Sequence, residues 1–112
     1  MAGTPAPLPA ADLQLAARLA DAGRLEDARQ ICETHLREAG PSAQAFYLLG
    51  LVRDARGEDG EAGEFYRKAV YLDPHHGEAL LHLALRAERD GDPAAARTLR
   101  KRARRARERS AA

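Results

Sequence analysis

The chain has 112 residues, of which 45% are hydrophobic and 31% charged, and these are ordinary values for one small folded domain. No apolar run approaches the ~20 residues that cross a bilayer, and a single cysteine excludes an internal disulfide, so we expect a cytoplasmic protein. The net charge of +1 conceals an asymmetry. Residues 97–109 hold eight Arg or Lys against one Glu, and the rest of the chain carries a net charge of −6.

The first segment, residues 1–9, is rich in Pro and Ala, which predicts an extended, flexible tether. The domain itself is expected over residues 10–109, and residues 110–112 are expected to fray. A tether that leads into a repeat array is what a piece of a longer protein would show.

After the tether, the sequence repeats itself with a period of 34 residues. Three triplets have this spacing: Gly23, Gly57 and Gly91; Ala28, Ala62 and Ala96; and Leu15, Leu49 and Leu83. The period predicts an all-α solenoid of three stacked helix-turn-helix repeats, at about 9–42, 43–76 and 77–110. The six helices are expected near 10–22, 25–38, 42–56, 59–72, 76–90 and 93–109.

The first repeat keeps the periodic leucine, glycine and alanine but departs from the pattern elsewhere, as terminal repeats are expected to do. Cys32 falls on an apolar helix position and has no catalytic partner readable from the sequence, so we expect a small core residue. His35 occupies a position that usually holds Ala, which favours a packing role.

The middle repeat is the clearest copy, and its signature residues are Phe46, Leu49, Gly50, Gly57, Ala62, Tyr66, Ala69 and Pro74. Small residues at Gly50 and Ala62 would let the two helices approach closely. Gly57 can supply a left-handed cap where the first helix stops. The pattern resembles the tetratricopeptide repeat, with Phe46 where Trp is usual and Arg53 where Tyr is usual.

The third repeat ends in the basic segment, in which one apolar stripe at helical spacing is formed by Ala95, Ala96, Leu99, Ala103 and Ala106. The simplest interpretation is a capping helix with its arginines in solvent. The alternatives are an acidic protein partner, or nucleic acid or anionic lipid; the absence of interleaved aromatic residues argues against single-stranded nucleic acid. The candidate basic face is Arg97, Arg100, Lys101, Arg104 and Arg105.

In the repeat family that the chain resembles, the first helix of each pair lines a binding groove. The corresponding positions are Leu13, Ala17, Tyr47, Leu51, Leu81 and Leu85. They are nearly all apolar and include no Lys or Asn that would clamp a peptide carboxylate, which favours an apolar helix or extended segment as ligand. The alternative is that these residues pack on neighbouring helices.

No group of residues in the sequence predicts catalysis, a metal site or a cofactor. His75 and His76 follow Pro74 in a turn and His82 lies about two helical turns further on, without a Cys or second carboxylate at ligand spacing, so solvated histidines are expected. The glycines at 57, 60 and 63 have no preceding strand that would make a nucleotide loop.

Residues 44–105 are similar to the C-terminal repeat region of CheR-type chemoreceptor methyltransferases, most clearly over residues 45–50, 66–74 and 78–85. The resemblance implies a non-catalytic domain that regulates, positions or assembles an enzyme that uses S-adenosylmethionine to methylate receptor glutamates. It implies a protein partner: the chemoreceptor, the parent enzyme, another signalling protein or a second copy. The alternatives are a free-standing bacterial adaptor and, third, a protein that binds nucleic acid or an acidic partner through its basic helix.

Overall fold

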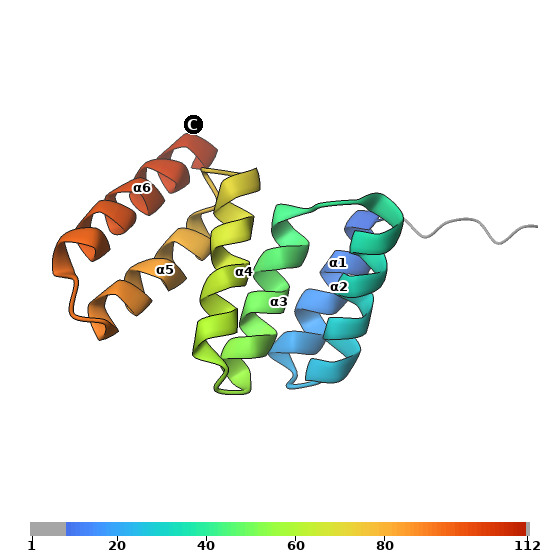
Figure 1. Ribbon diagram of the computed structural model, residues 1–112. Coiled ribbons are helices and arrows are strands. Elements are labelled where there is room, and N and C mark those ends of the chain that lie inside the picture. Colours follow the sequence, from blue (N-terminus) through green and yellow to red (C-terminus); the bar gives the residue numbers. More distant parts are fainter. Residues whose placement is uncertain (1–8, 112) are drawn as a thin grey trace, which may run out of the picture.

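The computed structural model describes residues 9–111, so the expected tether lies outside the described residues except for its last position. Within this range the chain forms six helices and no strand. The helices are α1 (Pro9–Asp21), α2 (Leu25–Ala39), α3 (Ala43–Ala55), α4 (Asp59–Leu72), α5 (Gly77–Arg89) and α6 (Pro93–Ala111). They stack as three antiparallel pairs in an elongated array of 58 × 35 × 22 Å (Figure 1). The predicted all-α solenoid is confirmed.

The observed helix ends lie within two residues of the expected ones, and the largest difference is at the C-terminus. Helix α6 continues to Ala111, whereas the sequence predicted fraying from residue 110. Ala103 and Ala106 of α6 are buried, and Gly77 at the start of α5 lies close to both. This contact with α5 holds the part of α6 around Ala103 and Ala106 in place. The residues after it continue the same helix as far as Ala111.

The turns inside each pair use the periodic glycine, as predicted. Gly23, Gly57 and Gly91 have φ angles of 79°, 76° and 80°, in the left-handed region that a side chain would disfavour. Between the first two pairs, the Ser42 side chain caps α3 by accepting a hydrogen bond from the Ala45 backbone N–H at 3.2 Å. Local sequence signals therefore set where the helices stop and restart.

Within the second pair, the two helices approach as closely as the small residues suggested. A Cβ atom on Gly50 would overlap the ring of Tyr66, which is itself fully buried. Ala62 and Ala69 of α4 are also fully buried against α3. Gly50 is therefore required by the aromatic side chain that packs on it.

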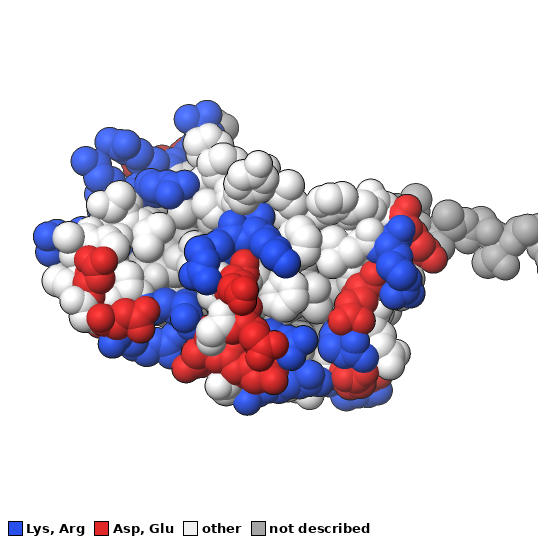
Figure 2. All heavy atoms as spheres, in the orientation of Figure 1, with Lys and Arg blue, Asp and Glu red and all other residues white. Residues whose placement is uncertain are grey.

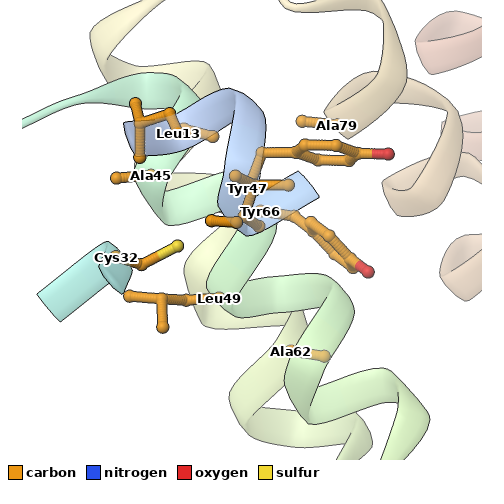
Figure 3. Packing of buried hydrophobic residues seen from close by; sticks show 11 residues of the cluster. Leu13, Cys32, Ala45, Tyr47, Leu49, Ala62, Tyr66 and Ala79 are labelled. Atoms are coloured by element: carbon orange, nitrogen blue, oxygen red, sulfur yellow. The ribbon is translucent and has the colours of Figure 1, made fainter. Parts of the chain in front are cut away.

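Between pairs, the second helix of one repeat packs on the first helix of the next. Leu49 of α3 lies beside Cys32 of α2 in the core, and both are buried (Figure 3). Leu15, the equivalent residue of α1, is 42% exposed. Among the described residues, no helix precedes α1 to cover this position. Leu83, the third equivalent, is half-buried against the core.

Candidate partner-binding surfaces

The six predicted groove residues do not form one open groove. Leu13 and Tyr47 are core residues, at 8% and 6% exposure, whereas Leu81 is 46% exposed and Leu85 is 51% exposed. The remaining two, at positions 17 and 51, are half-buried and pack on the edge of the core.

The difference arises because a following helix covers the first two repeats. The Tyr47 hydroxyl donates to the Glu78 carboxylate at 3.3 Å, and its ring lies 4.9 Å from that of His76, so the start of α5 closes over it. Figure 3 shows the Tyr47 ring beside Ala79 of α5. Leu13 of α1 is buried in the same way, because it lies in the core where α1 contacts α3, the first helix of the next repeat. Leu81 has no such cover among the described residues.

The six positions therefore separate into two sets. Residues 13 and 47 face the next repeat and serve stacking, and residue 81 occupies the same position in the third repeat, where no described helix follows. Residues 17, 51 and 85 follow them by one helical turn and become more exposed along the array, from half-buried to open. Only the second set, together with the uncovered Leu81, can contact a partner without unfolding.

Two of the histidines expected to be solvated have structural partners instead. The His76 ring caps α5, because its Nδ1 accepts from the Ala79 backbone N–H at 3.2 Å and its Nε2 lies 3.0 Å from Gln44 Oε1. His82 is half-buried and stacks on the ring of Tyr66 at 4.8 Å. Gln44, the partner of His76, and Tyr66, the partner of His82, are each more than ten residues away in the sequence. No local signal could therefore have revealed these contacts.

Burial shapes the protonation of this cluster. It lowers the pKa of His82 below its ordinary value, although the nearby Asp54 and Glu78 carboxylates act in the opposite direction. It also raises the pKa of Tyr66, whose hydroxyl donates to Asp54. The cluster is a hydrogen-bonded part of the interface between the second and third repeats.

A hollow of about 430 Å³ opens beside this cluster, between the end of α3, the start of α4 and α5. Leu85 supplies its apolar surface, and the carboxylates of Asp54, Asp59 and Glu88 supply most of its charge. We name this surface the inner hollow.

A groove of about 530 Å³ lies between the start of α5 and the second half of α6, and we name it the end groove. Its apolar lining includes Leu81, Ala103 and Ala106, and its basic lining consists of Arg100, Arg104 and Arg107. Figure 2 shows the Lys and Arg side chains gathered over α6, whereas along α2 they alternate with Asp and Glu.

The predicted basic face is split by this groove. Arg100 and Arg104 line it, whereas Arg97, Lys101 and Arg105 are exposed elsewhere on α6. Arg107 also lines the groove, about one helical turn after Arg104. It was not among the predicted residues of the basic face.

A third surface was missed by the sequence analysis. Phe46 and Phe65 stack at 6.2 Å, and the Lys68 ammonium lies 5.6 Å and 5.4 Å from their ring centroids. Nearby, Tyr71 is 86% exposed and Leu72 is 43% exposed. The apolar residues that follow Ala69, the last signature alanine of α4, could have indicated this surface from the sequence.

Among residues 9–111, no group of three or more His, Cys, Asp or Glu is arranged to hold a metal ion. None of the described helices is both long and apolar enough to cross a membrane.

Three stacked antiparallel pairs with a 34-residue period, a left-handed glycine in each turn and small residues between helices define a tetratricopeptide-repeat domain. The chain matches no protein-family model. It is similar to the C-terminal part of WspC-type methyltransferases.

The sequence similarity is to two Pseudomonas proteins named probable biofilm formation methyltransferase WspC. The chain is 50% identical over 101 residues to that of Pseudomonas aeruginosa, which is 90% of the chain and 24% of the relative. It is 51% identical over 90 residues to that of Pseudomonas putida, which is 80% of the chain and 21% of the relative. The chain therefore spans less than a quarter of the length of these curated relatives.

Solved structures share the fold. The crystal structure of MamA superposes with a TM-score of 0.74 at 26% identity, covering 92% of this chain and 60% of that one. PcrH, solved in complex with the chaperone binding region of PopB, superposes with a TM-score of 0.74 at 22% identity, covering 95% and 86%. The predicted class of repeat is confirmed.

Proposed function

We propose that this domain is the partner-recognition part of a WspC-like protein methyltransferase in the cytoplasm. It would bring the enzyme to its protein substrate without taking part in the chemistry. The enzyme would transfer a methyl group from S-adenosylmethionine to glutamates of a chemoreceptor. The observation that carries the proposal is 50% identity over 90% of the chain to a protein named as a methyltransferase, of which the chain covers 24%.

The inner hollow is the surface we assign to the receptor or another signalling partner. Leu85 is 51% exposed there, and the hollow opens directly onto the interface between the second and third repeats. A side chain of this size in water favours an apolar contact. Carboxylates around it favour an apolar segment flanked by Lys or Arg. PcrH, which has the same fold, takes up a segment of another protein, and this supports the choice of a peptide-like ligand.

A domain exchange tests the proposal. In the Pseudomonas aeruginosa relative, the region that matches this chain would be deleted or replaced by this chain. We expect deletion to lower receptor methylation in cells strongly, and replacement to restore it, because the recognition surface is supplied again. Full methylation after deletion would show that the domain does not recruit the enzyme.

A second measurement separates recruitment from catalysis. The isolated chain should neither bind S-adenosylmethionine in calorimetry nor transfer methyl groups, since residues 9–111 contain no strand, glycine loop and helix arranged for that cofactor. Added in excess, it should compete with the full enzyme for receptor and lower methylation. Leu85→Ser should abolish the competition. Tyr71→Ser, which removes an exposed aromatic far from the inner hollow along α4, should leave it intact.

A further inference from the structure

The end groove lies in the third repeat at the place where the second repeat holds the start of α5. In the second repeat, Tyr47 of α3 and Ala69 of α4 are buried in one core cluster with Ala79 of α5. Under the 34-residue period, Leu81 and Ala103 are the equivalents of the first two, and both line the end groove. Among residues 9–111, no helix follows α6 to fill this groove of about 530 Å³. The groove therefore has the form of a seat for a helix.

One face of α6 is a row of arginines. Spacings of three, four and three residues place four of them on the same side of the helix, and we name this set the arginine row: Arg97, Arg100, Arg104 and Arg107. The last three line the end groove, and the first continues the row toward the start of α6. The equivalent residues of α4 include no basic side chain: Gly63, Tyr66, Val70 and Asp73.

In the second repeat, this face of α4 holds α5. A Cβ atom on Gly63 would meet Arg86 of α5, and the ring centroids of Tyr66 and His82 lie 4.8 Å apart. The Asp73 carbonyl accepts a hydrogen bond at 3.0 Å from the backbone N–H of the residue that precedes α5. The arginine row of α6 therefore occupies the positions that, one repeat earlier, contact the next helix.

Arginines outnumber carboxylates at the end groove. Glu78 is the carboxylate of its lining and already accepts from the Tyr47 hydroxyl at 3.3 Å. Arg100 pairs with Glu88 of α5. None of the ion pairs among residues 9–111 includes any of the other three arginines of the row. Their positive charges are therefore available to a partner.

A helix that enters the groove adds positive charge of its own, because its first turn carries the positive end of the helix dipole. In the second repeat this end meets the Asp73 carbonyl, whereas Arg107 stands at the equivalent position in the third. Carboxylates in the first turns of the entering helix would offset both the dipole and the arginines. The groove therefore fits the acidic start of a helix, with small or apolar residues toward Leu81 and Ala103.

We infer that the end groove and the arginine row bind the acidic start of a helix from another protein. The occupant would stack on α6 as α5 stacks on α4. Residues 1–8 of this chain contain no Asp or Glu and so lack the charge that the row requires. The site is separate from the inner hollow, so the inference does not depend on the proposed function.

Fluorescence anisotropy with two synthetic peptides tests the site. Both copy residues 74–89, which include α5, and are changed at three positions. His76 and Arg86 contact α4 as described above, and Leu83 lines a hollow with Val70. The acidic peptide carries His76→Asp, Leu83→Glu and Arg86→Glu, and the neutral peptide carries His76→Asn, Leu83→Gln and Arg86→Gln. At about 0.05 M salt the acidic peptide should bind at least about tenfold more tightly, and the preference should shrink at about 1 M salt.

Charge reversal within the row should remove this preference. Arg104→Glu with Arg107→Glu should weaken binding of the acidic peptide about tenfold or more and change that of the neutral peptide less than about threefold. The matched control, Arg105→Glu with Arg109→Glu, makes the same change of charge on the same helix outside the row, and should change either dissociation constant less than about threefold. All four arginines are exposed, so circular dichroism should report unchanged helix content.

Equal binding of the two peptides, equal losses in the two variants, or no binding of the acidic peptide at about 1 mM would overturn the inference. A single-stranded RNA oligonucleotide or vesicles of anionic lipid that bind more tightly than the acidic peptide would also overturn it, because the row would then serve phosphate groups. So would self-association of the chain in sedimentation velocity that is lost in the Arg104→Glu, Arg107→Glu variant, because the occupant would then be a second copy.

Discussion

Leu49→Ala and Leu15→Ala together test how the array is held together, because the two residues occupy the same position of successive repeats. Leu49 is 4% exposed and Leu15 is 42% exposed. Truncation of Leu49 removes three buried carbon atoms, worth about 0.8 kcal/mol each, and leaves a cavity beside Cys32. We expect a loss of roughly 2–5 kcal/mol in the free energy of unfolding. Leu15→Ala should cost about 1 kcal/mol or less, since much of that side chain is already in water.

Urea denaturation followed by circular dichroism measures the free energy of unfolding of both variants. With a slope of about 1–3 kcal/mol per molar urea, Leu49→Ala should lower the midpoint by roughly 1–3 M. A small domain has only about 5–15 kcal/mol in total, so this variant lies close to the limit of folding. Equal midpoints for the two variants would refute the assignment of Leu49 to the contact between repeats.

Three further predictions follow from the core and its buried groups. Gly50→Ala should lower the melting temperature because its Cβ atom overlaps the tyrosine ring packed on it, whereas Gly60→Ala, in open space on α4, should be neutral or raise it. Burial raises the pKa of the Cys32 thiol to about 12, so an aromatic disulfide reagent should react slowly at pH 8 and rapidly in urea; fast reaction of the folded chain would contradict this. The lowered pKa of His82 means that the unfolded chain binds a proton more readily, so stability should fall as the pH drops below about 6.5; His82→Gln should flatten this slope more than His75→Gln does.

The fold could be predicted from the sequence because the information is local and repeated. A glycine, an alanine and a leucine recur every 34 residues, and each acts on its own turn or on the helix next to it. The caps at Ser42 and Gly57 lie in the same short segments. A pattern of this kind needs no knowledge of distant contacts, which is why the helix ends were placed within two residues.

The binding surfaces could be predicted only in part, because exposure depends on distant neighbours. His76 was assigned to solvent, yet its ring bridges to Gln44 of the preceding repeat. Tyr47 was a candidate groove residue, with packing on a neighbouring helix as the alternative, and α5 closes over it. Both cases concern contacts between repeats that are about one period apart, and no local spacing distinguishes a covered position from an open one.

In a repeat array, equivalent residues therefore acquire different roles from their place in the stack. Tyr47 and Leu81 share a register position, but among the described residues only Tyr47 has a following helix to bury it, so Tyr47 stabilises the fold and Leu81 stays exposed. The same reasoning applies to Leu15 at the opposite end. Among the described residues, Leu15 at one end of the array and Leu81 at the other are partly exposed at positions that the middle repeat buries. Leu85, one turn away from the stacking position, is the exposed residue that the proposed function assigns to a different protein.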